Sequence, residues 1–182
     1  FYRYFRLISR NEVGGDPERL YASPQAFHIA NRNRLSRFPF SMVASATHDH
    51  KRGEDVRARL NVISELPELW EQLVQRVDEL SEIYLTTLDE EEAPSRNDRY
   101  LLYQTILGTW PFGLEPPEYT GIGEYTDRIS GYMTKALREG KVHTSWTNVN
   151  EEYERATEQF LRSLLNPKGS TVILRTFGEA VG

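Results

Sequence analysis

Five consecutive segments of this chain place apolar residues three and four positions apart, and this helical period limits the possible folds more than any other feature. Proline, glycine and acidic runs separate the segments. A further short helix is expected at 172–180, and the acidic run at 87–95 is predicted to be a solvated loop. We therefore predict a mainly α protein, an irregular helical bundle. The five segments cover residues 54–66, 67–80, 97–107, 125–137 and 153–164.

Capping residues mark the beginnings of several of these helices. Ser23, followed by proline, is typical of a helix start, with Ser as the cap and Pro in the first turn. Pro67 can open a helix for the same reason, and Ser95 or Asn97 can cap the next one. Asn148, with a glutamate three positions later, resembles a capping box and predicts a helix start there.

The first 53 residues differ from the rest, because they hold one helical segment and a run that changes from apolar to polar. Phe27, Ala30 and Leu35 predict the apolar face of a helix that ends near residue 37. Residues 40–46 are mostly apolar, and the polar run Thr-His-Asp-His-Lys-Arg follows at 47–52. A buried segment that ends in a dense polar cluster and then enters a helix often exposes active-site groups.

Composition and charge exclude several classes of function. The 182 residues suffice for one domain with a sizeable core, and the absence of cysteine excludes disulfides and cysteine metal sites. The net charge of −5 argues against general nucleic-acid binding. No apolar run approaches the roughly 20 residues of a membrane helix. We therefore expect a cytoplasmic protein without nucleic-acid or membrane partners. The chain begins at Phe1 rather than Met, and we expect it to be an excised piece of a larger protein.

His48 and Asp49 form the first candidate site. A carboxylate beside an imidazole can hydrogen-bond the hydroxyls of a sugar or take part in a metal site. The residues alone favour a simpler interpretation, a solvated polar turn before a helix. His50 lies two positions from His48, but a metal would need further ligands from elsewhere, and no metal is predicted.

A second polar cluster at 141–148 surrounds a tryptophan with hydroxyl and amide side chains. The face of a tryptophan can stack on a sugar ring while nearby polar groups bind its hydroxyls. The alternative, which the residues alone favour, is that the tryptophan packs into the bundle and the polar side chains cap helices. Lys141, His143, Ser145 and Trp146 belong to this cluster, and only the family resemblance given below makes them candidates for substrate binding.

Four blocks of the sequence resemble the maltooligosyltrehalose synthases, (1→4)-α-D-glucan 1-α-D-glucosylmutases of the α-amylase superfamily. The blocks keep their order along the chain and are long and unusual in composition. Two positions depart from the family pattern: His50 stands where Thr is usual, and Val149 stands where Pro is usual. The blocks are NEVGGDPER at 11–19, THDHKRGEDVRARL at 47–60, RNDRYLLYQTILGTWP at 96–111 and KALREGKVHTSWTNVNEEYE at 135–154.

The resemblance implies roles for both polar clusters. Asp49 would be the carboxylate that stabilises the transition state of sugar transfer, and His48 would contact the same sugar. Lys51 and Arg52 would hold the substrate or neighbouring carboxylates, and the second cluster would contribute weaker candidates for substrate binding. The nucleophile and the general acid would lie upstream of Phe1, so the isolated chain should be inactive. The resemblance implies no cofactor.

The family's fold and reaction follow from the same resemblance. Residues 1–53 would be a late part of a (β/α)8 barrel, with 40–46 as its seventh strand, and 54–182 a helical subdomain inserted before the barrel closes. Without the neighbouring barrel strands of the same protein, 40–46 should be a loop, disordered, or paired with another copy. The whole enzyme would convert the reducing-end α-1,4 bond of a maltooligosaccharide into an α,α-1,1 trehalose bond.

Two alternatives stay open at this point. The first is a non-catalytic, all-helical interaction or structural module, which the helical stripes and the acidic surface support without any family resemblance. The second is a piece of a related α-amylase-superfamily hydrolase or glucanotransferase, because the same carboxylate would serve all of these reactions.

Overall fold

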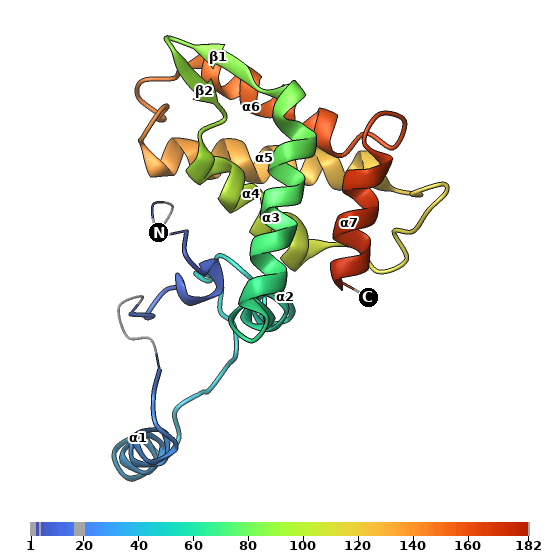
Figure 1. Ribbon diagram of the computed structural model, residues 1–182. Helices are drawn as coiled ribbons and strands as arrows, with labels where there is room; N and C mark the ends of the chain where they lie inside the picture. Colours follow the sequence, from blue (N-terminus) through green and yellow to red (C-terminus); the bar gives the residue numbers. More distant parts are fainter. Residues whose placement is uncertain (1–2, 4, 17–20, 182) are drawn as a thin grey trace.

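The computed structural model describes residues 3, 5–16 and 21–181, and this part of the chain is mainly α-helical (Figure 1). The helices form the irregular bundle that the sequence predicted, beside one sheet of two short strands. Residues 17–19 of the NEVGGDPER block lie outside the described residues. No helix within the described ranges is long and apolar enough to cross a membrane. The elements in chain order are η1 (Ile8–Arg10), α1 (Pro24–Arg37), α2 (Glu54–Asn61), η2 (Val62–Ser64), α3 (Pro67–Ser81), η3 (Glu82–Tyr84), β1 (Thr86–Leu88), β2 (Glu91–Ala93), α4 (Arg96–Thr109), α5 (Ile122–Gly140), α6 (Glu151–Leu164) and α7 (Thr171–Val181).

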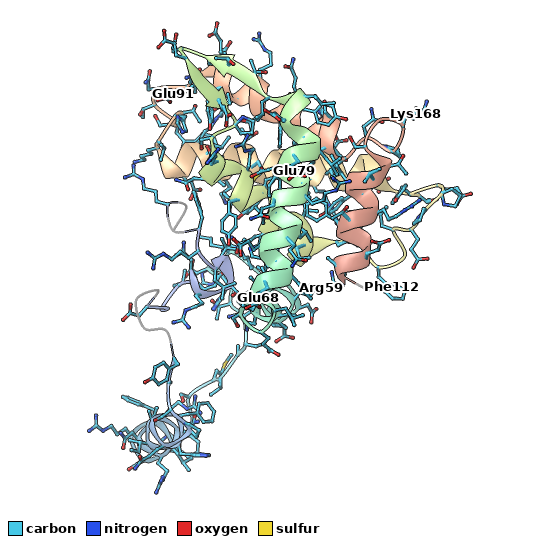
Figure 2. All side chains as sticks on the ribbon, viewed as in Figure 1. Arg59, Glu68, Glu79, Glu91, Phe112 and Lys168 are labelled. Atoms are coloured by element: carbon cyan, nitrogen blue, oxygen red, sulfur yellow. The ribbon has the colours of Figure 1, made fainter. Side chains whose placement is uncertain are left out.

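Helix α1 lies apart from the other helices (Figure 1). Ser23 caps it as predicted, because its hydroxyl accepts a hydrogen bond from the Ala26 N–H at 3.1 Å. No residue of α1 is buried, and Phe27 and Leu35 are 61% and 67% exposed. Figure 2 shows its side chains projecting into solvent on all sides. The residues predicted to form an apolar face are therefore unburied within the described chain.

The apolar run at 40–46 is a loop, which is one of the three outcomes that the sequence predicted. No strand forms anywhere across residues 38–53, and Phe40 and Met42 are each 97% exposed. A strand in this position would need a neighbour to pair its N–H and C=O groups. The two strands of the described chain pair only with each other. The segment near 40–50 therefore lacks the neighbours that a barrel strand requires.

The main core lies where helices α2 to α7 face one another. Each helix contributes large apolar side chains that are completely buried, and burial of one such side chain stabilises the fold by roughly 1.5–3 kcal/mol. Trp110 and Phe177 stack within this core with ring centroids 6.1 Å apart. The buried residues include Leu60, Val77, Leu101, Leu102, Ile106, Phe160, Leu161, Leu164, Leu174 and Phe177.

Gly108 allows α2 to lie directly against α4. A Cβ atom at this position would lie only 2.9 Å from Val56 Cγ1 and 3.1 Å from Leu60 Cγ, both on α2. Any larger residue would push the two helices apart. Because α2 begins two residues after Arg52, this contact fixes the direction in which the chain leaves the first polar cluster.

Residues 5–10 are tied to the helical body by a buried side chain of α4. The Gln104 carbonyl oxygen accepts the Ile8 N–H at 2.9 Å, and the Gln104 amide donates to the Phe5 carbonyl at 2.6 Å. Gln104 is fully buried, and Ile8 belongs to the main core. Residues 5–10 are therefore packed with the helices.

Residues 86–93 form a β-hairpin, whereas the sequence predicted a solvated acidic loop. Thr86 pairs with Ala93, and Leu88 pairs with Glu91, in antiparallel register. Ala93 is buried in a small second core with Leu137, and Leu88 packs against the same cluster. Glu91 lies out in solvent at the hairpin, as Figure 2 shows. The prediction was wrong because Leu88 and Ala93, at the two ends of the acidic run, pack against the second core.

Two helices differ in detail from the predicted patterns. In α3, Trp70 faces the core. Leu69, an apolar residue of the segment predicted at 67–80, is 59% exposed instead. Helix α6 is capped by Asn150, which accepts the Tyr153 N–H at 3.1 Å, and not by Asn148. The predicted cap lay two residues too early, because Asn148 has a glutamate three positions later, whereas Asn150, the cap of α6, has Tyr153 at that position.

Candidate functional site

The His48-Asp49 pair lies in an exposed turn between the loop at 40–46 and the start of α2. The His50 N–H donates to the Thr47 carbonyl at 3.1 Å, and His50 Nδ1 accepts the Thr47 N–H at 2.9 Å. The side chains of His48 and Asp49 are 91% and 64% exposed, and His48 Nε2 lies 3.6 Å from Asp49 Oδ1. The turn therefore presents an accessible imidazole and carboxylate side by side. His50, the residue that departs from the family pattern, closes the turn.

The two residues after this turn are held by a buried carboxylate. The Lys51 N–H donates to Glu12 Oε2 at 2.7 Å, and the Arg52 guanidinium donates to Glu12 Oε1 at 3.3 Å. A second nitrogen of Arg52 donates to the Tyr132 hydroxyl of α5 at 2.9 Å. Glu12 and Arg52 are almost completely buried. Arg52 therefore pairs with the carboxylate of Glu12.

Glu12 and Tyr132 are contacts of the site that sequence reasoning missed. Glu12 lies 39 positions before Lys51, in the turn-rich first block, and no spacing rule connects the two. Its place in a block that resembles the family was the one available signal. Tyr132 lies in the apolar pattern of α5, where an aromatic residue usually indicates core packing.

The second cluster occupies the loop 141–150 between α5 and α6. Lys141 ends α5 in a left-handed backbone conformation with φ of 55°, and its carbonyl accepts a hydrogen bond from Arg3 at 3.2 Å. Ser145 and Asn148 close a turn, because each N–H reaches the other residue at 3.0 Å. The candidates Lys141 and Ser145 are thus placed on an ordered loop, with Lys141 exposed.

His143 is packed rather than free. Its ring stacks on Tyr153 with centroids 4.3 Å apart, and its Nε2 lies 3.9 Å from Asp98 Oδ2. The Tyr153 hydroxyl donates to the same carboxylate, and the Ser95 hydroxyl donates to it at 2.9 Å. Burial raises the pKa of Tyr153, and the charge of Asp98 raises it further. This network joins the loop to the start of α4.

Trp146 is 56% exposed, so the alternative that it packs into the bundle is wrong. The Arg138 guanidinium carbon lies 4.9 Å from the centre of its ring. Arg138 also forms a two-pronged ion pair with Glu154, at 2.8 and 2.7 Å. The Arg138 hydrogen bonds, aided by one from Thr144, lower the pKa of Glu154. These contacts hold an aromatic surface open to solvent.

Helix α5 supports both clusters. Tyr132, which holds Arg52, and Arg138, which holds Trp146, are both on this helix. They are separated by about 9 Å along its axis, at roughly 1.5 Å per residue. One rigid element therefore sets the relative placement of the two candidate surfaces.

No group of three His, Asp or Glu side chains comes together as a metal site would require, within residues 3, 5–16 and 21–181. The two imidazole rings have different contacts. His50 Nδ1 accepts the Thr47 N–H, whereas His48 Nε2 lies beside Asp49. The chemistry available at the turn is therefore that of a carboxylate and an imidazole.

Comparison with known sequences gives one consistent result. No family model matches the chain. Two proteins from strains of Mycobacterium tuberculosis, each assigned as a maltooligosyl trehalose synthase, are 36% identical to it over 166 residues. The match covers 91% of this chain but 20% of each relative. The chain thus spans about a fifth of the length of the curated relatives that it matches.

Solved structures with a similar fold carry the same name. A crystal structure of a maltooligosyl trehalose synthase superposes with a TM-score of 0.81 at 32% identity, covering 99% of this chain and 23% of that one. A hypothetical maltooligosyl trehalose synthase from Sulfolobus tokodaii gives 0.80 at 35% identity, with 99% and 23% covered. The synthase from Arthrobacter ramosus gives 0.78 at 32% identity, with 98% and 21% covered. The arrangement of the helices is therefore shared over nearly the whole chain.

Proposed function

We propose that this chain, a relative of the maltooligosyl trehalose synthases over one segment of their length, forms part of the active site of such an enzyme. The whole protein would convert the reducing-end α-1,4 bond of a maltooligosaccharide into an α,α-1,1 bond. The shared sequence and fold, at 36% identity and a TM-score of 0.81, support this proposal. The remaining barrel strands of the same protein would complete the site beside residues 40–50.

Asp49 is the proposed carboxylate that stabilises the transition state. Positive charge develops at the anomeric carbon during glycosyl transfer, and a fixed carboxylate that bonds the ring hydroxyls stabilises it. The exposed Asp49 side chain, with His48 at 3.6 Å, is suited to meet a sugar from the open side of the turn. His48 would bond a further hydroxyl, and Lys51 would contribute a positive charge at the same place. Arg52 would act through the buried carboxylate that it holds.

The loop 141–150 is the proposed second contact with the glucan. Trp146 offers an exposed ring face, and Lys141, His143 and Ser145 are polar groups of the same loop. Carbohydrate sites commonly combine an apolar surface with a few placed polar groups. We assign the barrel part to residues 1–53 and the helical subdomain to 54–182. The subdomain would help to exclude water, because water entering the site would hydrolyse the intermediate.

The nucleophile and the general acid of glycosyl transfer are not assigned to any residue of this chain. Glu54 and Asp55 occupy the first turn of α2, where acidic residues stabilise the helix dipole. We therefore expect the isolated 182-residue chain to release no product from maltooligosaccharides. Measurable turnover by the pure chain would contradict this assignment.

The test is an Asp49→Asn substitution in a full-length synthase that carries this segment. Turnover of maltooligosaccharide to a trehalose-ended product should fall roughly 100- to 1,000-fold, the usual cost of losing a transition-state electrostatic contact. Substrate binding should change much less, because the contact matters most in the transition state. Asp55→Asn, six positions later and exposed, is the matched control and should leave turnover unchanged. Near-normal turnover of Asp49→Asn would refute the proposal. Free glucose in place of a trehalose-ended product would indicate a hydrolase.

A further inference from the structure

We propose that Glu12 is a positioning residue for Asp49, acting through the backbone of Lys51 and the guanidinium of Arg52. The proposal rests on the role proposed above for Asp49. It assigns a function to a buried residue of the NEVGG turn that lies outside the exposed turn at 47–50. The clamp is defined here as Glu12, Lys51, Arg52 and Tyr132.

Both carboxylate oxygens of Glu12 are used within the clamp. Oε2 accepts the Lys51 N–H at 2.7 Å, and Oε1 lies 3.3 Å from the Arg52 guanidinium. The side chains of Glu12 and Arg52 are only 6% and 7% exposed. Ion pairs this buried survive only when hydrogen bonds satisfy both partners, and loss of one partner leaves an uncompensated charge. The Tyr132 hydroxyl accepts a further hydrogen bond from Arg52 at 2.9 Å and so ties the pair to α5.

The clamp acts on the backbone next to Asp49. The Lys51 amide lies two residues after Asp49, and the short turn between Thr47 and His50 transmits its position to the carboxylate. On the other side of the turn the chain is exposed, and the Ser45 carbonyl is held by Arg57 of α2. Glu12 is thus the buried, charged anchor of the turn. A shift of about 1 Å at a reacting group can cost a hundredfold in rate.

The test compares Glu12→Gln with a matched control in the full-length synthase. Glu92→Gln is the control, because Glu92 also pairs with a buried arginine, Arg99, at 3.1 Å but lies on the hairpin. We expect Glu12→Gln to lower kcat roughly 10- to 100-fold with little change in KM. Glu92→Gln should leave kcat unchanged and lower the melting temperature less than Glu12→Gln does, because the Glu92 side chain is 52% exposed and Arg99 keeps Asp78 at 3.6 Å. Equal kcat values for Glu12→Gln and wild type would overturn the proposal.

Tyr132→Phe provides a second route if Glu12→Gln fails to fold. This substitution removes one hydroxyl and adds no bulk. We therefore expect kcat to fall, but by a smaller factor than in Glu12→Gln. Unchanged kcat in Tyr132→Phe, with Glu12→Gln unfolded, would overturn the clamp as a positioning device.

The double variant Asp49→Asn/Glu12→Gln separates the two proposals. If Glu12 works through Asp49, its loss should lower kcat far less in the Asp49→Asn background than in the wild type. The same factor in both backgrounds would show that Glu12 acts elsewhere and would overturn this inference. If Asp49→Asn alone turns over normally, the proposed function fails. If Asp49→Asn is impaired while Glu12→Gln is not, only the role of Glu12 fails.

Discussion

Replacing Gly108 with alanine should destabilise the helical body, although the same change in an exposed helix is normally stabilising. Alanine is favoured over glycine inside a helix by about 0.8–1 kcal/mol. At Gly108, however, the added Cβ would lie 2.9 Å from Val56 Cγ1, and carbon atoms prefer about 3.5–4.0 Å. The overlap falls on a side chain packed between α2 and α4, so the two helices must move apart.

The magnitude follows from two opposing effects. Overpacking of a filled core costs typically about 1–3 kcal/mol, which outweighs the gain of about 1 kcal/mol in helix propensity. We expect Gly108→Ala to lower the free energy of unfolding by about 1 kcal/mol. Gly131 of α5 provides the matched control, because nothing lies within 4 Å of a Cβ built there. Gly131→Ala should raise the free energy of unfolding by about 1 kcal/mol.

Urea unfolding of the purified chain, followed by far-UV circular dichroism, measures both changes from the shift of the midpoint at constant slope. Val56→Ala removes the closest atom, so Gly108→Ala should be much less harmful in that background than in the wild type. If Gly108→Ala stabilises the chain as much as Gly131→Ala does, the close approach of α2 to α4 is wrong.

Two further variants test the buried polar contacts. Gln104→Leu should lower the free energy of unfolding by about 2–4 kcal/mol, because the Ile8 N–H and the Phe5 carbonyl each lose a buried partner. The Ile8 amide should also lose protection in hydrogen exchange. Unchanged protection would contradict the contact. Glu154→Gln tests the ion pair with Arg138, which holds the pKa of Glu154 below its ordinary value of 4.5. A lowered pKa stabilises the fold above the unfolded pKa, and this contribution is lost as the pH falls through the folded value. The difference in melting temperature between wild type and Glu154→Gln should therefore be large at neutral pH and shrink below pH 4.5; a constant difference would refute the assigned cause.

Helix positions were predictable because the signals that define them are local. The hydroxyls of Ser23 and Ser95 cap the helices that follow them, as their sequence context predicted. Pro67 opens α3 in its first turn. The hairpin at 86–93 was not predictable in the same way, because its stability comes from Ala93 packing against α5 and α6, which lie far along the chain.

The candidate site also has parts that the sequence predicted and parts that it did not. The sequence singled out Asp49 and Trp146, because unusual polar runs and a family resemblance are visible without coordinates. Nothing in the residue pattern indicated that Arg52 would be buried, or that it would bond Glu12 and Tyr132.

The sequence by itself determined that this chain is mainly helical, at which residues most of its helices begin, and which short run carries the candidate chemistry. These properties depend on periodicity and capping over a few residues. The tertiary structure decided which charges are buried and which remain exposed, because burial depends on partners 39 to 80 positions away. It also decided that residues 40–46 are a loop, since a strand is stable only when a second strand satisfies its backbone groups.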